Sequence, residues 1–415
     1  MVGPDVEIDG ASFDSRIIQP GQLFVPLVAE RDGHEFVAVA LERGAAAYLT
    51  SVPAAHGTAI EVPDTLRALM ALAAAQRLTF GGPVIGITGS VGKTSTKDLA
   101  LAALAASTPT WANERSFNNE QGLPTTLLNT PDGTKVLMLE MGMRGFGEIA
   151  ELCAIARPTI GVVTRVAEAH SDRVGGIEGV ARAKAELIEA LPSDGIAILN
   201  ADDARVRAMS AMCAGRVLLY GEADDADLRV SRLQLDDLAR ASFHLDTPWG
   251  ACDARLFVSG RHMVSNAAAA LACVGAVNGD LAAGVAALGQ VGLTAMRMDV
   301  QRTAAGAIIL NDSYNANPTS MRAALDALAD LEALRRVAVL GLMAEIVDSE
   351  AEHRAIANYA AERGIELIAY GTDLYGVAPI DDPVRALGSL ASGDAVLVKA
   401  SRVVGLERVA GALLG

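Results

Sequence analysis

The chain contains few cysteines and lacks a long apolar run. Its 4 cysteines, among 415 residues, lie far apart and form no CxxC pair, which argues against a zinc knuckle or a disulfide framework. No apolar stretch is long enough to cross a bilayer, and the first residues lack the basic segment and apolar run of a signal peptide. We therefore expect a soluble cytoplasmic protein.

Basic residues are also in deficit. Lys and Arg number 34 against 50 Asp and Glu, which gives a formal net charge of -16. This balance argues against a nucleic-acid backbone or an anionic membrane surface as the main partner, although a local basic pocket could bind a small phosphorylated substrate. Hydrophobic residues make up 51% of the chain, and no low-complexity tract or internal repeat is visible. A well-buried globular protein is expected.

The chain is longer than one hydrophobic core usually supports, so more than one domain is expected. Residues 1–79 mix short apolar runs with turns and end in an Ala/Leu-rich helix that reaches about Gln76. Gly81-Gly82-Pro83 then breaks the pattern. Strands alternate with helices from Val84, and a second alternating block begins after about Leu293. We predict three domains, with the bounds 1–79, 80–293 and 294–415.

Apolar runs of strand length recur in both alternating blocks. In the first block we predict helices from about Lys93 and Glu148, and strands at 84–88, 136–140 and 159–164. Continuous apolar strands between helices indicate a parallel sheet that is covered on both faces. In the second block the expected strands are 307–310, 337–340, 367–370 and 395–398. The fold class is therefore α/β in all three domains, of which the first is small.

Residues 88–95 read Thr-Gly-Ser-Val-Gly-Lys-Thr-Ser and lie between an apolar strand and a helix. This is a phosphate-binding loop by physical role: glycines let backbone N–H groups approach the phosphates, Lys93 neutralises charge, and Thr94 can ligate magnesium. Ile87 stands where the strict motif has its first glycine, and a glycine-rich turn without a ligand is the alternative. The expected nucleotide-binding residues are Gly89, Ser90, Val91, Gly92, Lys93, Thr94 and Ser95.

Two further side chains follow strands of the first block. Glu140 ends the strand at 136–140, at the sheet edge where doubly wound folds bind their ligands, and is expected to hold magnesium. A glutamate at a strand end is, taken alone, more often a solvated terminus. His170 follows the strand at 159–164, and the default interpretation of such a histidine is structural.

Lys184 falls on the apolar face of a predicted helix. Helical spacing places it on the same stripe as Val180, Leu187, Ile188 and Leu191. A lysine in this position must extend its amine to solvent, be paired, or be chemically modified. Spacing alone favours the first of these.

A polar loop follows the first predicted strand of the second block, at residues 311–317. Asp312 could accept hydrogen bonds from a ribose, and the amides of Asn315 and Asn317 could contact a base edge. The alternative is an Asn/Pro-rich helix entry. That alternative explains the composition but not the concentration of polar groups directly after an apolar strand.

Taken in order, these segments resemble the Mur ligase family over nearly the whole chain. Within the family, Asn118-Asn119 followed by Gly122 and Pro124, together with residues 312–318, is similar to the branch that adds D-alanyl-D-alanine. The Asp-Asn-Pro-Arg motif of the diaminopimelate-adding branch is absent. The matching segments are Asp14–Arg16, Pro20–Phe24, Asp32–His34, Thr88–Ser95, Asn118–Pro124, Glu140–Gly142, His170, Lys184, Leu199–Asp203, His262–Asn266, Arg297, Asn311–Pro318 and Gly393–Lys399.

The resemblance implies an ATP-dependent ligase that joins D-alanyl-D-alanine to a UDP-N-acetylmuramoyl-tripeptide through an acyl phosphate. It implies an N-terminal domain for the UDP-linked precursor, a central P-loop ATPase-like domain and a C-terminal Rossmann-like domain. ATP and two magnesium ions are the implied cofactors. The implied partners are these small molecules, with no nucleic acid and no membrane insertion, and we expect a monomer.

The resemblance also implies roles for individual residues. Lys93, His170 and Lys184 would be catalytic, and family members carry at the position of Lys184 a carbamylated lysine that binds a second magnesium ion. Carbamylation turns a cation that repels magnesium into an anion that can ligate it. The other implied residues are Asn266, Arg297, Asp312 and Asn315 for ATP, Ser15, Arg16, Asn118 and Asn119 for the acceptor, and Thr94, Glu140, His170 and Lys184 for magnesium.

Arg165, Leu342 and Ala400 depart from the family's usual residues on the nucleotide and amine sides. Two other functions therefore stay open. One is a Mur-type ligase that joins a different amino acid or peptide to another carboxylate, and the other is a nucleotide-binding subunit without ligase activity. Retention of Lys93, Thr94, Glu140, His170 and Lys184 together argues against the second, because a subunit that only binds nucleotide has no need of all five.

Overall fold

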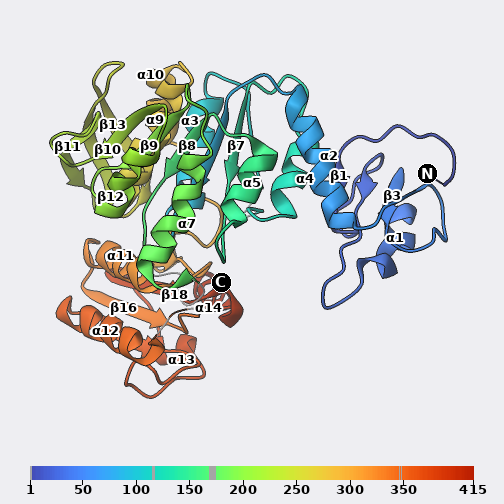
Figure 1. Ribbon diagram of the computed structural model, residues 1–415. Helices are drawn as coiled ribbons and strands as arrows, with labels where there is room; N and C mark the ends of the chain where they lie inside the picture. Colours follow the sequence, from blue (N-terminus) through green and yellow to red (C-terminus); the bar gives the residue numbers. More distant parts are fainter. Residues whose placement is uncertain (1, 115–116, 168–173, 345, 347) are drawn as a thin grey trace.

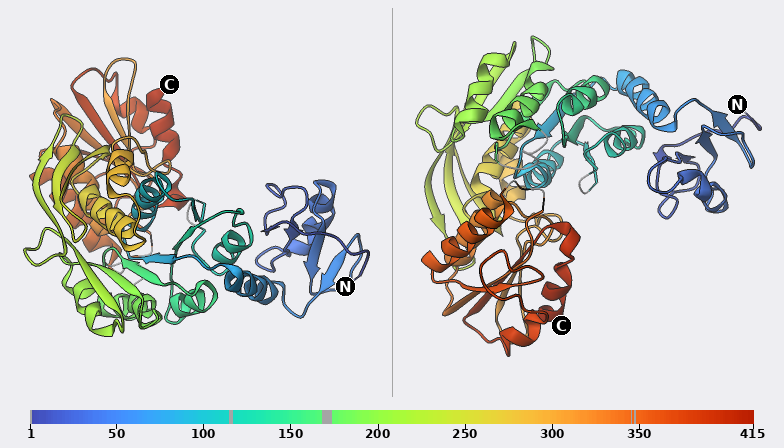
Figure 2. Two further views of the ribbon diagram at one scale, coloured as in Figure 1. Left: turned by 90° about the horizontal axis from the view of Figure 1, so that it is seen from above. Right: turned by 60° about the horizontal axis from the view of Figure 1, so that its bottom comes forward.

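A computed structural model describes residues 2–114, 117–167, 174–344, 346 and 348–415. Within these residues the strands form three sheets, one in each successive part of the chain, and the α/β fold class expected from the sequence is confirmed. The small N-terminal sheet and the C-terminal sheet both adjoin the central part and lie apart from each other (Figure 1, Figure 2). In the described residues no helix combines the length and apolarity needed to cross a membrane.

The N-terminal sheet is parallel, with the order β1-β2-β3-β4. Its strands and helices are β1 Ala11–Ser12, β2 Leu23–Phe24, η1 Gly33–Phe36, α1 Val37–Glu42, β3 Ala47–Thr50 and β4 Ala59–Glu61. The long helix α2 (Thr65–Thr79) then leads to the central part and ends three residues beyond the expected Gln76. Asp64 begins α2, because its side chain accepts a hydrogen bond from the backbone N–H of Arg67.

The central sheet has the order β13-β12-β11-β10-β9-β8-β5-β7-β6. It is parallel from β6 to β11, and β12 and β13 extend it in antiparallel fashion. The predicted strands at 84–88 and 136–140 are confirmed, and the third is shorter by one residue at each end. The strands are β5 Val84–Thr88, β6 Thr110–Ala112, β7 Val136–Glu140, β8 Ile160–Val163, β9 Ile196–Asn200, β10 Arg216–Gly221, β11 Leu228–Leu235, β12 Arg240–Asp246 and β13 Cys252–Ser259.

Helices cover both faces of the central sheet, as the continuous apolar strands indicated. Ile85 and Ile87 of β5 pack in one apolar cluster with α3, α9 and α10, whereas Val84 packs in another with α2, α5 and α7. The helices of this part are α3 Lys93–Ala105, α4 Gly122–Leu128, α5 Glu148–Ala156, α7 Ile177–Glu189, α8 Ala204–Ala208, η2 Met209–Met212, α9 Met263–Ala276 and α10 Leu281–Leu288.

The C-terminal sheet has the order β14-β15-β18-β16-β17, in which β14 is antiparallel to the rest. All four strands predicted in this block are present, with shifts of one or two residues at their ends. The elements are β14 Asp299–Arg302, β15 Ile308–Asn311, α11 Pro318–Ala329, β16 Arg335–Leu340, α12 Ser349–Glu362, β17 Glu366–Ala369, α13 Pro383–Leu387, β18 Asp394–Lys399, η3 Arg402–Val404 and α14 Glu407–Leu414.

Candidate functional site

A cleft of about 1580 Å³ lies between the central sheet and the C-terminal domain. The phosphate loop forms part of its wall, and residues that follow β15 and β18 line it from the other domain. The carboxyl ends of β5, β7 and β8 open into this cleft, which is where parallel α/β sheets bind ligands.

Two glycines of the phosphate loop have backbone conformations and surroundings that exclude a side chain. Gly92 precedes α3 with φ of 85°, and a Cβ there would lie 2.7 Å from Oδ1 of Asn266. Gly89 has φ of 151°, and a Cβ there would lie 1.9 Å from Oγ1 of Thr164. The first turn of α3 can therefore present its backbone N–H groups to an anion at close range.

The phosphate loop is fastened to the segment that follows β8. The backbone N–H of Ser90 donates to the carbonyl of Arg165 at 2.7 Å, and Oγ1 of Thr164 donates to the carbonyl of Val91 at 2.6 Å. The hydroxyl of Ser90 donates to the carbonyl of Ala167 at 2.9 Å. These contacts hold the loop in a binding-ready shape without a ligand, and they occupy the Ser90 side chain structurally.

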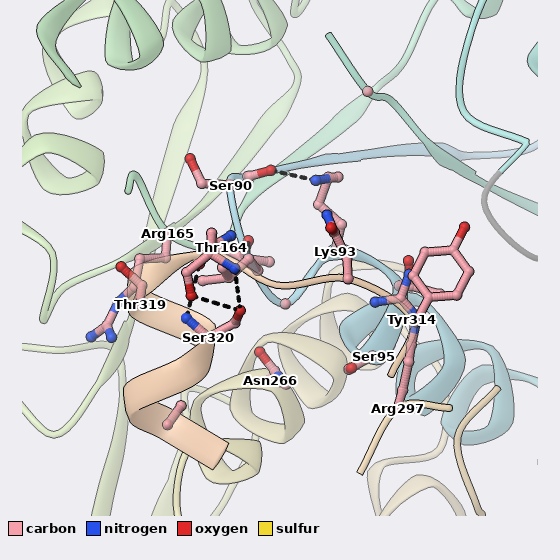
Figure 3. Close-up of a pocket in the computed structure, with 18 of the residues that line it drawn as sticks. Ser90, Lys93, Ser95, Thr164, Arg165, Asn266, Arg297, Tyr314, Thr319 and Ser320 are labelled. Carbon is pink, nitrogen blue, oxygen red and sulfur yellow. Dashed lines mark hydrogen bonds between the residues drawn. The ribbon is translucent and has the colours of Figure 1, made fainter. Parts of the chain in front are cut away.

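Lys93 starts α3 and folds back over the loop, where its Nζ donates to the carbonyl of Gly89 at 2.6 Å (Figure 3). Burial lowers the pKa of Lys93, the carboxylate of Glu140 opposes this shift, and Arg297 adds to it. The lysine thus lies where the phosphates of a nucleotide would complete its hydrogen bonds.

Glu140 is 1% exposed at the end of β7, and both of its carboxylate oxygens accept hydrogen bonds. Oγ1 of Thr94 donates to one at 2.8 Å, and Nδ2 of Asn118 donates to the other at 2.7 Å. A hydroxyl that donates to a carboxylate keeps its lone pairs for a cation, so this pair fits magnesium. The described residues contain no group of three or more His, Cys, Asp or Glu arranged to hold a metal ion. His170 lies outside the described residues.

Lys184 lies on α7 and lines the cleft, with 4% of its surface exposed. Val180, Leu187 and Ile188 beside it are buried, as helical spacing predicted. Burial lowers the pKa of Lys184 well below its usual value, and the positive charge of Lys93 adds to this shift. Lys184 is therefore a desolvated lysine in the wall of the cleft, near enough to Lys93 for the two positive charges to repel each other.

Arg297 approaches the cleft from the linker to the C-terminal domain. Its guanidinium carbon lies 4.0 Å from the centre of the Tyr314 ring, and its Nε is buried without a hydrogen-bond partner among the described residues (Figure 3). The neighbouring Met296 and Met298 have φ of 65° and 47°, a conformation that side-chain-bearing residues rarely adopt. The backbone on both sides of Arg297 is thus strained, and the half-buried guanidinium keeps one buried N–H without a partner among the described residues, which is the arrangement expected beside an anionic ligand.

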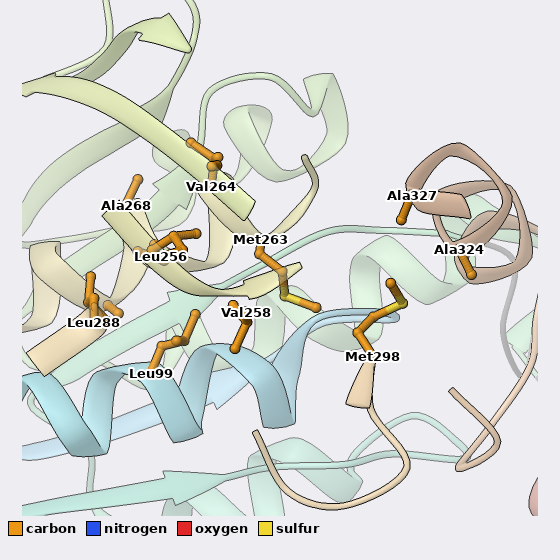
Figure 4. Packing of buried hydrophobic residues seen from close by; sticks show 14 of the residues in the cluster. Leu99, Leu256, Val258, Met263, Val264, Ala268, Leu288, Met298, Ala324 and Ala327 are labelled. Carbon is orange, nitrogen blue, oxygen red and sulfur yellow. The ribbon is translucent and has the colours of Figure 1, made fainter. Parts of the chain in front are cut away.

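The linker is anchored by packing and by an acidic loop residue. Met298 shares an apolar cluster with Met263 of α9, Leu99 of α3 and Ala324 of α11 (Figure 4). The backbone N–H of Met298 donates at 3.0 Å to Asp312. The apolar cluster therefore runs from the central domain through the linker into the C-terminal domain.

The polar loop after β15 divides into structural and cleft-lining parts. Asp312 lines the cleft, and its other oxygen accepts from Nζ of the buried Lys399 at 2.5 Å. Asn315 also lines the cleft, while its Oδ1 accepts from the backbone of the next residue. Asn317 lines the cleft as well, but its side chain is engaged in a capping box with Ser320 at the start of α11. The helix-entry alternative therefore describes the side chain of Asn317. Asp312 and Asn315 reach the cleft with side-chain oxygens that already accept hydrogen bonds within the domain, which fixes their orientation toward a ligand.

The residues expected to bind the acceptor lie in two places. Asn118 and Asn119 line the cleft, and Oδ1 of Asn119 also accepts from the backbone N–H of Gly122 at the start of α4. Ser15 is buried in the N-terminal domain, and the side chain of Arg16 is 83% exposed and pairs with Asp14. The structure thus does not bring Ser15 and Arg16 to the phosphate loop.

Two residues at the site gave no signal that we recognised in the sequence. Thr164 contacts the phosphate loop, and its only indication was a polar residue directly after an apolar strand. Asn113 is buried beside Glu140, to whose backbone it is hydrogen-bonded. Neither residue type is diagnostic on its own.

Two family models match the chain. Residues 87–274 match the Mur ligase middle domain, and residues 296–402 match the Mur ligase glutamate ligase domain. The UDP-N-acetylmuramoyl-tripeptide--D-alanyl-D-alanine ligase of Mycobacterium bovis is 40% identical over 97% of this chain and 91% of its own length. The enzyme of that name from Bacillus subtilis is 39% identical over 83% of this chain and 75% of its own length.

Solved structures show the same similarity. A crystal structure of MurF from Acinetobacter baumannii matches with a TM-score of 0.86 at 29% identity, and the match covers 99% of this chain and 94% of that one. MurF ligase from Thermotoga maritima in complex with ADP matches with a TM-score of 0.83 at 26% identity, over 97% of this chain and 96% of that one.

Proposed function

Because the chain belongs to the Mur ligase family, we propose that it joins D-alanyl-D-alanine to a UDP-N-acetylmuramoyl-tripeptide with conversion of ATP to ADP and phosphate, in peptidoglycan precursor synthesis. The observation that carries the proposal is the cleft, in which the phosphate loop faces Arg297 and Asp312 of the other domain. We propose that it works in the cytoplasm, where ATP is supplied. We propose that it acts as a monomer, with domains at 1–79, 80–293 and 294–415.

ATP would lie across this cleft. The backbone N–H groups of residues 89–95 and Nζ of Lys93 would bind its phosphates, since the helix start offers both donors and a favourable dipole. The buried Nε of Arg297 would donate to the nucleotide, and the Tyr314 ring, 4.0 Å from the guanidinium carbon, would hold the side chain in place. Asn266 lies against the loop at Gly92, and Asp312 and Asn315 would contact the ribose and base from the second domain.

Thr94 and Glu140 would hold one magnesium ion, and His170 with Lys184 a second. When bound, the ions neutralise charge that develops on the phosphoryl group. The chain's part is to keep the hydroxyl of Thr94 and the carboxylate of Glu140 2.8 Å apart before the ion arrives.

Lys184 has the chemistry needed for carbamylation. A neutral amine adds to carbon dioxide, forms an N–C bond and releases one proton, which leaves a carbamate anion. Burial and the charge of Lys93 lower the pKa of Lys184, so a larger share of its amine is neutral near pH 7. An unmodified ammonium in this place would be repelled by both Lys93 and a metal ion. The carbamate would reverse that sign and supply an oxygen ligand.

The reaction would proceed in two steps. The terminal carboxylate of the tripeptide is a poor acyl donor, so it first attacks the γ-phosphate of ATP to form an acyl phosphate and ADP. The amine of D-alanyl-D-alanine then attacks the acyl carbon, the amide bond forms, and phosphate leaves. Asn118 and Asn119 would orient the acceptor at the cleft, and Ser15 and Arg16 would bind its UDP part. Closure of the domains would exclude water from the acyl phosphate.

Phosphate release tests the proposal. The chain is incubated with ATP, magnesium and UDP-linked tripeptide, and D-alanyl-D-alanine is compared with single amino acids. We expect release that depends on the dipeptide, and its loss in Lys93→Ala with an unchanged melting temperature, because Lys93 faces ligand and packs little core. Release with a single amino acid instead would indicate a Mur-type ligase for another amine. Failure to turn over ATP with any amine would support a nucleotide-binding subunit.

A further inference from the structure

Asn113 is a buried amide beside the site to which the mechanism above gives no role. It follows β6, an edge strand of the central sheet, and is 1% exposed. Its Oδ1 accepts from the backbone N–H of Glu140 at 2.9 Å, and its Nδ2 donates to the carbonyl of Glu140 at 3.2 Å. The last paired residues of β6 and β7 are Ala112 and Met138, two residues before Glu140. The Asn113 side chain thus supplies the rung of the ladder that β6 is too short to provide.

The same amide also fixes the loop that carries Asn118. Nδ2 of Asn113 donates a second hydrogen bond, at 2.8 Å, to the carbonyl of Phe117. Asn118 comes next in the chain, and its Nδ2 donates to the carboxylate of Glu140. From the opposite side, Nζ of Lys97 on α3 donates to the carbonyl of Asn113 at 2.8 Å. One residue therefore ties together β7, the Asn118 loop and the helix that begins at the phosphate loop.

We propose that Asn113 is a positioning residue for the cation site: it fixes the backbone at Glu140 and the loop at Asn118, so that the carboxylate points at Thr94 before a divalent cation binds. This inference rests on the proposed function. It goes beyond it because Asn113 would contact neither cation nor nucleotide. Without the amide, the carboxyl end of β7 would lose both hydrogen bonds on its outer edge, and Glu140 could turn away from Thr94.

A purely structural role for Asn113 would predict a different result. Loss of an edge contact alone lowers stability and leaves the affinity for cations unchanged in the molecules that remain folded. Loss of positioning weakens cation binding in a folded protein and is overcome by excess cation. Cation affinity and stability therefore have to be measured on the same variants.

The test measures Mn²⁺ binding by electron paramagnetic resonance, with saturating ADP, on full-length wild type, Asn113→Ala and Asn113→Thr. Threonine suits a strand end and keeps a hydroxyl, but it is too short to bond both Glu140 and Phe117, so it serves if the alanine variant does not fold. Thr110→Ala is the matched control: Thr110 begins β6, at the end away from Asn113, and its hydroxyl donates to the carbonyl of Thr108 and to no other group in the described part of the chain.

We expect the Mn²⁺ dissociation constant to rise at least tenfold in the Asn113 variants, with unchanged ADP affinity in the absence of metal and an unchanged constant in Thr110→Ala. ATP turnover of the variants should recover at high Mg²⁺, as a higher activation constant with a near-normal kcat. Folded Asn113 variants that bind Mn²⁺ within twofold of wild type would overturn the proposal and leave the proposed function standing. Absence of Mn²⁺–ADP binding in the wild type would overturn both.

Discussion

Asn129 links the N-terminal domain to the central one by hydrogen bonds, and its replacement by alanine should weaken the contact between these domains. Asn129 lies at the end of α4, and its Nδ2 and Oδ1 form a two-way pair with the backbone of Ala11 at 2.8 and 3.1 Å. Oδ1 also accepts from Nε2 of Gln22 at 2.9 Å. A further bond, from Nδ2 to the carbonyl of Thr125, stays within its own helix. The side chain thereby completes the free edge of β1, which would otherwise expose unpaired backbone.

The size of the effect follows from these contacts. Each hydrogen bond contributes about 0.5–1.5 kcal/mol net, and three of those made by Asn129 cross between the domains. Ala11 is 1% exposed, so water cannot readily replace the lost partners of its backbone. We expect Asn129→Ala to lower the free energy of unfolding of the N-terminal domain by about 2–3 kcal/mol. The KM for the UDP-linked acceptor should rise while kcat stays near normal, because the phosphate loop is untouched.

Urea unfolding and limited proteolysis within the first 79 residues would measure the change in stability. Steady-state kinetics would measure the change in KM for the UDP-linked acceptor. Asn129→Asp keeps the two contacts in which Oδ1 accepts, but it replaces Nδ2 by a carboxylate oxygen that faces the carbonyls of Ala11 and Thr125. Because these oxygens repel one another, it should lose at least as much stability as the alanine variant. Thr130→Ala serves as the control, since Thr130 lies just after α4 and, among the residues that the structure describes, its hydroxyl donates only to the carbonyl of Thr126 in the last turn of that helix. The reasoning fails if the free energy of unfolding of Asn129→Ala lies within about 0.5 kcal/mol of the wild-type value and the KM for the UDP-linked acceptor is unchanged.

Three other outcomes are expected. Lys184→Ala should lose ligase activity far more than nucleotide binding, with partial recovery in added short carboxylic acids; a fully active variant would return Lys184 to the class of lysines that extend to solvent. Arg16→Ala should raise the KM for the UDP-linked acceptor, and an unaltered KM would remove Arg16 from that role. His353 donates from Nδ1 to the carbonyl of Ser349 and accepts at Nε2 from the N–H of Met343, and burial lowers its pKa. As pH decreases, the His353 imidazole is therefore protonated in the unfolded chain before it is protonated in the folded one. The free energy of unfolding should keep its full value above about pH 6.5 and fall below it, by at most about 1.4 kcal/mol per pH unit. Between pH 7.5 and 5 the melting temperature of His353→Gln should depend less steeply on pH than that of the wild type. Equal pH dependence in the two proteins would contradict this.

The sequence predicts best those features that depend on local spacing. The strand at 84–88, the phosphate loop and the helix from Lys93 all follow from one short segment, and each is present as expected. The burial of Lys184 on an apolar stripe likewise needs only the period of the helix. Such predictions succeed because the physical cause lies within a few residues along the chain.

Features that depend on the approach of distant segments were missed. Nothing near Asn129 indicates Ala11, which lies 118 positions earlier, and an amide in isolation reads as a turn residue. The antiparallel strands β11 to β13 were also not predicted. β12 and β13 do alternate buried and exposed residues over much of their length, but irregular pairing interrupts the register along both edges of β12.

A short helix, α4, lies between Asn118, four residues before its start, and Asn129, directly after its end, and it connects acceptor binding to the cation site. α4 spans Gly122–Leu128, so it is about 10 Å long and too short to bend appreciably. At its far end Asn129 holds the N-terminal sheet, and shortly before its near end Asn118 donates to the carboxylate of Glu140. A displacement of the N-terminal sheet would therefore be passed to the groups around Glu140. Asn129→Ala should for this reason increase the Mg²⁺ activation constant modestly, in addition to raising the acceptor KM, whereas Thr130→Ala should change neither. An acceptor KM that rises with no change in Mg²⁺ dependence would show that the two ends of α4 act independently.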